Sequence, residues 1–140
     1  MKNILLSTIL LFTSLSTFAA GTTVRIGAVG ETMAFDKTTF EVKAGSDVTV
    51  IFKNVSKTLE HNWVLTEPGK DQTVAMEGIK AGGDKGWFAK TADVIAFTKM
   101  IKPGGEEKVS FKAPTKPGSY PYICTFPGHS AMMKGTMIVK

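Results

Sequence analysis

The chain has 140 residues, of which 43% are hydrophobic, and a formal net charge of +5 at pH 7. This length fits one domain with a hydrophobic core of its own. The positive charge is modest and contains no basic run, which argues against nucleic-acid binding and is compatible with acidic protein partners. Cys124 is the only cysteine, so an internal disulfide bond is excluded.

The N-terminal segment has the pattern of a secretory signal peptide. Lys2 gives a short positive region, residues 4–15 are largely apolar, and small residues precede a cut after Ala19. We therefore expect residues 1–19 to be removed and residues 20–140 to form the exported domain, with a net charge of +5 − 1 = +4. A retained N-terminal anchor is the alternative, but the apolar stretch is short and interrupted by Ser and Thr. No cysteine stands at the cut, so a lipid anchor is not expected.

From Thr22 onward the chain contains short runs in which apolar and polar residues alternate. Runs of about four to eight residues with a period of two predict half-buried β-strands. Their apolar members are Val24 and Ile26, Phe40 and Val42, Val48, Val50 and Phe52, Val109 and Phe111, and Met137 and Val139. Turn signals separate the runs at Gly45-Ser46, Pro103-Gly104-Gly105 and Pro117-Gly118. The pattern predicts an all-β fold, an antiparallel sandwich or barrel.

One stretch, residues 68–93, lacks this alternation and is richer in Gly, Lys and Ala. Within it, Ala75, Met76 and Ile79 have helical spacing, and Gly82 begins a Gly-Gly stop signal. We predict a short helix followed by a loop, inserted between strands. An irregular loop throughout is the alternative.

The last quarter of the chain gathers three residue types that bind metals. Cys124 and His129 are separated by four residues, and three residues separate His129 from Met133. The pair Pro127-Gly128 predicts a tight loop, which can turn all three side chains toward one point. The strand pattern resumes at Lys134.

The other histidine, His61, precedes Asn62 and Trp63. On a strand, His61, Trp63 and Leu65 share one face, and Trp63 and Leu65 are core-forming types. We therefore predict that the imidazole of His61 points inward, where it needs a partner, because an unsatisfied buried polar group costs ~1–3 kcal/mol.

Each of these residues alone has a structural explanation. A histidine can be a hydrogen-bonded core residue, a buried cysteine a small hydrophobe, and Met132 and Met133 can fill gaps. Together, two histidines, one cysteine and one methionine in a β-sandwich are the ligand set of a trigonal copper site with a weak axial thioether. The chain has no other His or Cys. Thiolate and thioether ligands suit Cu(I), and imidazole suits both oxidation states. A rigid site with this mixture of ligands changes its geometry little when copper gains an electron.

The chain resembles the azurins and the azurin-like auracyanins of the cupredoxin family. The resemblance is carried by residues 122–136, which contain Cys124-Thr-Phe-Pro-Gly-His129, by residues 61–65 and by residues 94–99. It implies a cupredoxin fold, a Greek-key β-sandwich of about eight strands with one short helix. It also implies one type 1 (blue) copper ion per chain.

The resemblance further implies roles for individual residues. His61, Cys124 and His129 would be the strong copper ligands, Met133 the long axial ligand, and the backbone carbonyl of Glu60 a weak fifth contact. Asn62 would brace the ligand loop, and backbone N–H groups near Phe126 would reach the thiolate sulfur. Electrons would pass through the exposed edge of His129, which an apolar docking patch surrounds. The patch positions are Met33, Leu59, Ile79, Phe126, Pro127, Ala131 and Met132.

Three features depart from the azurin pattern. The two cysteines that form a disulfide in azurins are absent, so packing must replace a stabilisation of typically ~2–5 kcal/mol. Glu60 stands where azurins have glycine, and we expect its carboxylate to lie at the rim of the patch, to favour Cu(II) and to lower the reduction potential. Phe97 replaces a titrating histidine, so that position is not expected to make the potential depend strongly on pH near neutrality.

The predicted function is a periplasmic single-electron carrier with no enzymatic activity. The family implies exported redox partners, such as c-type cytochromes or a terminal reductase, and we expect a monomer without a membrane span in its mature form. A copper carrier or scavenger is the alternative, which exposed and exchangeable ligands would favour. Two histidines are too few for the second copper of a nitrite reductase or multicopper oxidase. A thiol enzyme using Cys124 would leave Met133 without a role.

Overall fold

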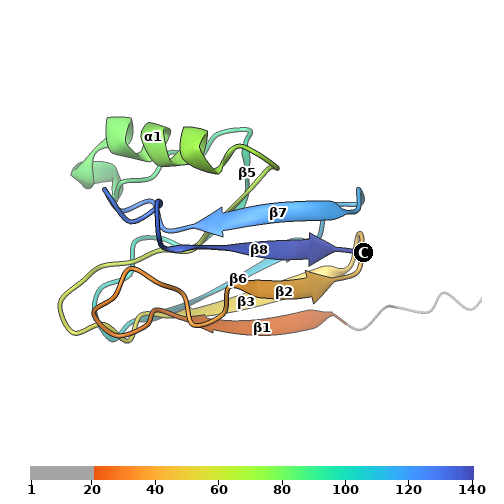
Figure 1. Cartoon of the computed structure of the whole chain (residues 1–140), viewed down its shortest axis with the longest axis horizontal. Helices are drawn as coiled ribbons and strands as arrows, with labels where there is room; N and C mark the ends of the chain where they lie inside the picture. The colour runs from red at the N-terminus through yellow and green to blue at the C-terminus, as the bar shows by residue number, and fades with distance from the viewer. Residues whose placement is uncertain (1–20) are drawn as a thin grey trace, which may run out of the picture.

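The computed structural model describes residues 21–140; the predicted signal peptide, residues 1–19, lies outside them. The described chain contains the strands β1 (Thr22–Gly27), β2 (Thr39–Val42), β3 (Asp47–Lys53), β4 (Val64–Thr66), β5 (Val94–Phe97), β6 (Glu106–Lys112), β7 (Gly118–Ile123) and β8 (Lys134–Val139). Helix α1 (Asp71–Ala81) and the 3-10 helix η1 (Gly83–Lys85) lie between β4 and β5. Figure 1 shows α1 beside β7, away from β1.

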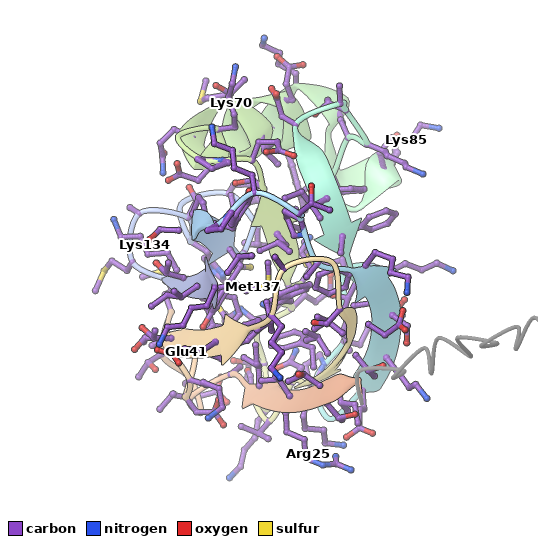
Figure 2. The ribbon with its side chains drawn as sticks, turned by 90° about the vertical axis from the view of Figure 1, so that its right-hand side faces the viewer. Arg25, Glu41, Lys70, Lys85, Lys134 and Met137 are labelled. Carbon is purple, nitrogen blue, oxygen red and sulfur yellow. The ribbon has the colours of Figure 1, made fainter. Side chains whose placement is uncertain are left out.

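The strands form two sheets that enclose one main core. The smaller sheet has the order β1-β3-β6 and the larger one β2-β8-β7-β4-β5. Figure 2 views the sandwich from the end near the C-terminus, with Met137 between the sheets and Arg25 at the periphery. Met137 is fully buried, in one core cluster with residues of both sheets such as Val50 and Tyr122. The predicted β-sandwich is confirmed.

The alternating runs correspond to strands that bury one side. Val48, Val50 and Phe52 of β3 are all 0% exposed. The predicted apolar members of β1, β2 and β8 are buried as well. Val109 and Phe111 of β6 are only half-buried, although β1 and β2, which are edge strands as β6 is, bury their apolar members. A period of two thus indicates which side of a strand is buried, but not how deeply that side is buried.

The strand directions differ from the antiparallel prediction at two places. β1 runs parallel to β3, with Thr22 opposite Val48, and β2 runs parallel to β8, with Thr39 opposite Thr136. The remaining ladders are antiparallel. An alternating pattern shows which side of a strand is buried but carries no information about the direction of its neighbour. The sheets are therefore mixed, and each parallel pair is joined through intervening chain, as parallel pairing requires.

Helix α1 confirms the helix predicted in the stretch without alternation. Gly82, at φ +80, ends it, a conformation that glycine adopts without strain. Val74 and Ala75 pack against Val64 of β4 and Ile123 of β7, so α1 covers the outer face of the larger sheet. Within residues 21–140, no helix is both long and apolar enough to cross a membrane.

Gly135 of β8 is expected to be required for the packing of the larger sheet. It lies opposite Tyr122, and a Cβ at Gly135 would overlap the buried Tyr122 ring. The hydroxyl of Tyr122 also donates to the carbonyl of Lys37. Gly135→Ala should therefore displace the ring and lower the free energy of unfolding by ~1–3 kcal/mol.

Chemical denaturation measures this change. The control is Ser119→Ala, at an exposed position of β7, which should stay within ~0.5 kcal/mol of the parent. Equal stabilities of Gly135→Ala and the parent protein would contradict the packing argument.

Candidate metal centre

The candidate ligands lie at one end of the sandwich, in segments that leave or enter strands. Cys124 follows β7, Met133 precedes β8, and His129 lies in the loop between them. His61 lies in the connection from β3 to β4. Figure 1 shows the β7–β8 loop at the end of the molecule opposite the C-terminus.

Three donor atoms from these segments face one another. Cys124 Sγ lies 3.8 Å from His61 Nδ1 and 3.7 Å from His129 Nδ1, and all three atoms lie within 4.8 Å of one another. A metal at the centre of a trigonal site, with bonds of ~2.3 Å to sulfur and ~2.0 Å to nitrogen, would hold sulfur and nitrogen ~3.8 Å apart. The spacing of the donor atoms therefore fits one metal ion between them.

The site is enclosed and its loop is closed by backbone hydrogen bonds. Cys124, His61 and Met133 are 0% exposed and His129 is 5% exposed. The N–H of Cys124 donates to the carbonyl of Met133 at 3.0 Å, and the N–H of Met133 donates to the carbonyl of His129 at 2.8 Å. Gly128 turns the chain at φ +81, which favours glycine. The tight loop predicted from the Pro-Gly pair is thus present and brings Met133 beside Cys124.

His61 is buried as predicted, although the reason differs from the prediction. It lies outside β4 and forms an isolated antiparallel bridge with Ile101. The N–H of His61 donates to the Ile101 carbonyl at 3.2 Å, and the N–H of Ile101 donates to the His61 carbonyl at 2.8 Å. Every residue from 61 to 66 is buried, because the main core covers one side of this segment and α1 covers the other. Strand parity therefore could not distinguish the inward side here.

Asn62 ties the two ligand segments together. Its side-chain amide donates to Thr125 Oγ1 at 2.8 Å, and its Oδ1 accepts a hydrogen bond from the Thr125 N–H at 2.8 Å. Both residues are buried. Because Asn62 adjoins His61 and Thr125 adjoins Cys124, these two bonds restrain the distance between two candidate ligands. The contacts support the bracing role predicted for Asn62.

The thiol of Cys124 must lose its proton before it can bind a metal. Burial raises the pKa of this thiol to about 11, against a smaller lowering by hydrogen bonds from the backbone of Asn62 and Phe126. The sequence prediction concerned backbone N–H groups near Phe126 and did not include that of Asn62. Without a metal the sulfur is protonated at neutral pH, so a metal ion that binds here displaces one proton.

The two imidazoles are neutral at pH 7. Burial lowers the pKa of His61 to about 4, with a further lowering from the charge of His129, and burial lowers the pKa of His129 as well. A single thiol proton can satisfy only one of the two Nδ1 atoms that face it. One cation between the three donors would satisfy all of them, so the donor set fits a metal ion.

The pKa of His61 predicts acid sensitivity of the metal-free protein. The pKa of His61 is lowered from 6.5 to about 4 in the folded state. The stability of the fold is therefore greatest above pH 6.5 and decreases as the pH falls from 6.5 to about 4. At 1.36 kcal/mol for each pH unit, the full loss is about 3 kcal/mol. Denaturation of the metal-free protein at pH 7 and pH 4 measures it. His61→Gln should show a smaller difference between the two pH values; an identical difference would contradict the assignment.

The residues predicted for the docking patch all retain solvent exposure. Met33, Ile79 and Met132 are 37%, 43% and 68% exposed. Ala131 is exposed, and Leu59, Phe126 and Pro127 are half-buried. The Phe126 ring packs beside the His129 ring, with centroids 4.7 Å apart. His129 is thus the histidine with access to the surface, through a small edge.

The sequence interpretation missed Trp87. The Trp87 ring packs edge-on against the Phe126 ring, with centroids 6.2 Å apart. Because Phe126 in turn packs beside His129, Trp87 supports His129 indirectly. Its backbone has φ +53, the one positive φ outside glycine within residues 21–140, and a Cβ at Gly78 would clash with its carbonyl oxygen. Trp87 lies in a loop without periodicity. The only available signal was a large aromatic residue in a glycine-rich segment.

A β-sandwich that encloses two histidines, one cysteine and one methionine at one end defines a type 1 (blue) copper protein. Residues 22–140 match the family described as copper binding proteins, plastocyanin/azurin family. The chain therefore belongs to the plastocyanin/azurin family of copper-binding proteins. His61, Cys124, His129 and Met133 form its type 1 copper site.

Individual relatives agree with this assignment. The chain is 39% identical over 120 residues to Auracyanin-A of Chloroflexus aurantiacus, an alignment that covers 84% of this chain and 74% of that protein. It is 41% identical over 117 residues to azurin of Pseudomonas fluorescens biotype C, covering 77% and 91% of the two chains. The structure of Na-dithionite reduced auracyanin from Roseiflexus castenholzii matches with a TM-score of 0.80 and 43% identity, over 87% of this chain and 99% of that one.

Proposed function

We propose that this protein is a periplasmic single-electron carrier in which one type 1 copper ion cycles between Cu(I) and Cu(II). The observation that carries the proposal is the enclosed donor set, in which Cys124 Sγ faces two imidazole nitrogens at 3.7 and 3.8 Å. Such a site has little room for a substrate, because its ligands are almost completely buried. It is suited to the exchange of an electron, and we propose no enzymatic activity.

The surrounding residues are proposed to keep the donors in place while the copper charge changes. The hydrogen bonds between Asn62 and Thr125 hold the two ligand segments together. Backbone N–H groups of Asn62 and Phe126 favour the thiolate form of the Cys124 sulfur. Met133 would supply a weak thioether contact to copper, and the backbone carbonyl of Glu60 a further weak contact. Rigid donors limit the reorganisation that accompanies each electron transfer.

Electrons are proposed to enter and leave through His129, within the apolar docking patch. The apolar side chains proposed for this patch include Met33, Ile79 and Met132, which are exposed, and exposed apolar patches commonly mark interaction sites. The proposed partners are exported redox proteins, such as c-type cytochromes or a terminal reductase. The net positive charge of the chain supports partners with acidic surfaces. The signal pattern of residues 1–19 supports export, and a monomer is proposed for the mature domain.

The visible and EPR spectra of the oxidised, copper-loaded protein test this function. An intense thiolate-to-copper band with a narrow parallel hyperfine splitting is expected. A colourless protein that nevertheless holds Cu(II) would overturn the proposal. Transfer of copper to a chelator tests the alternative of a copper carrier, and slow loss is expected because the ligands are buried.

Glu60 is proposed to lower the reduction potential. It directly precedes His61 and is half-buried, so its negative charge favours Cu(II) over Cu(I). Glu60→Gln should raise the potential by about 40 mV, which corresponds to a Coulomb interaction of about 1 kcal/mol. Voltammetry measures the change. Glu41→Gln, in β2 where Glu41 pairs with Lys140, is the control, and an unchanged potential in Glu60→Gln would exclude this role.

A further inference from the structure

The connection between β3 and His61 is held by a polar network that the sequence analysis did not identify. Figure 1 shows the loops that follow β1 and β3 at the same end of the molecule as the β7–β8 loop. The link between these two loops is the carboxylate of Glu31. It accepts hydrogen bonds from the N–H of Lys57, the hydroxyl of Thr58 and the hydroxyl of Ser56, the last at 3.0 Å.

The network continues inward from Ser56. Its Oγ accepts the N–H groups of Thr58 at 3.1 Å and Leu59 at 2.7 Å. The N–H of Ser56 in turn donates to Asn54 Oδ1 at 3.1 Å. The amide of Asn54 donates to the carbonyls of Leu59 at 2.9 Å and Ile101 at 2.8 Å. Asn54 and Ser56 are buried, so water cannot readily replace these bonds.

This network ends at the copper site. Ile101 is the residue that pairs with the backbone of His61. Leu59 is therefore restrained by the network and His61 by the bridge to Ile101, and Glu60 is the single residue between them. The Glu60 peptide is therefore restrained on both sides. Glu31 is the only member of the network that joins it to the loop carrying Met33.

We infer that Glu31 is a positioning residue that holds residues 56–58 and, through them, the Glu60 peptide and His61 in the geometry required by the copper site. The loop that carries Glu31 contains hydrogen bonds of its own, in which the Thr32 N–H and the Thr32 hydroxyl both donate to the Val29 carbonyl. Hydrogen bonds, chiefly from the Lys57 N–H, lower the pKa of Glu31, so it is ionised at neutral pH. This inference rests on the proposed function, since it concerns the same copper.

Substitutions of Glu31 that change the length of the side chain and its charge separately test the inference. Glu31→Asp keeps the charge but is one methylene shorter, so it cannot reach all three donors. Glu31→Ala removes both reach and charge, whereas Glu31→Gln keeps the reach and an acceptor oxygen. The control is Glu41→Ala, an exposed carboxylate of β2 that pairs with Lys140 and is remote from the network.

The readouts are the parallel hyperfine splitting, the ratio of the visible bands and the rate of electron self-exchange of the copper-loaded proteins. Glu31→Ala and Glu31→Asp should remain blue but show altered band ratios and splittings, with self-exchange slowed about tenfold, because misplaced donors add to the reorganisation of the site. Glu31→Gln should recover most of the parent spectrum, and Glu41→Ala should match the parent.

Other outcomes are equally informative. If Glu31→Asp matches the parent while Glu31→Gln differs, Glu31 acts through its charge and the inference is wrong. If all three variants match the parent, the inference is also wrong, while a blue parent protein still supports the proposed function. A parent protein that is not blue would instead overturn the proposed function. If Glu31→Ala does not fold, Glu31→Asp and Glu31→Gln decide between the outcomes.

Discussion

Cys124→Ser is expected to abolish the intense visible band and the reversible one-electron cycle. Cys124 Sγ faces both imidazoles, and the band arises from charge transfer between thiolate and copper. A serine hydroxyl occupies nearly the same space but does not ionise as a thiol does when copper binds. The variant should therefore fold and bind Cu(II) more weakly, with a spectrum typical of nitrogen and oxygen ligands. Visible and EPR spectra and voltammetry measure these changes.

Met133→Leu is the matched control for this substitution. Met133 is as buried as Cys124 and belongs to the same loop, but the axial thioether is a weak ligand whose identity tunes the potential. The variant should stay blue and show a higher reduction potential. If Cys124→Ser retained the intense band, the thiolate would not be its source and the copper assignment of this cysteine would be wrong.

Asn62→Leu is expected to weaken both the fold and the copper site. The substitution removes two buried hydrogen bonds and leaves the N–H and hydroxyl of Thr125 without partners. An unsatisfied buried group costs ~1–3 kcal/mol, so a loss of ~2–4 kcal/mol in the free energy of unfolding is expected. Because the bonds also restrain His61 relative to Cys124, copper affinity should fall by ~10–100-fold. Chemical denaturation of the metal-free protein and competition with a chelator measure the two effects separately.

Thr125→Val provides the graded comparison. It removes only the hydroxyl, while the N–H of residue 125 can still donate to Asn62 Oδ1. Its losses of stability and copper affinity should both be smaller than those of Asn62→Leu. If Asn62→Leu lowered stability but left copper affinity unchanged, Asn62 would be a structural residue without a bracing role at the metal.

Much of the ligand loop could be predicted from local sequence. Cys124, His129 and Met133 lie within one short loop whose closure depends on Gly128 and on hydrogen bonds inside the loop itself. Interactions of this kind connect residues that are close in sequence, so spacing alone carries the information. The end of α1 at Gly82 and the buried sides of β3 and β8 were predictable for the same reason.

The environment of His61 was less accessible to prediction. Its burial was predicted from strand parity, yet the described structure places it in an isolated bridge with Ile101, in a segment that is buried on both sides. The covering on one side comes from α1, which follows later in the chain. A periodic pattern reports one buried side of one element and cannot report a second layer contributed by a distant element.

The sequence by itself determined which residue types could bind copper and which side of most strands is buried, because both depend on residue identity and short spacing. Only the tertiary structure decided that β1 and β2 have parallel neighbours, that Asn62 meets Thr125, that Trp87 supports Phe126, and that Glu31 holds the loop before His61. Each of these is a contact between segments far apart in the chain. Such contacts depend on how the elements pack together, and no local pattern encodes that packing.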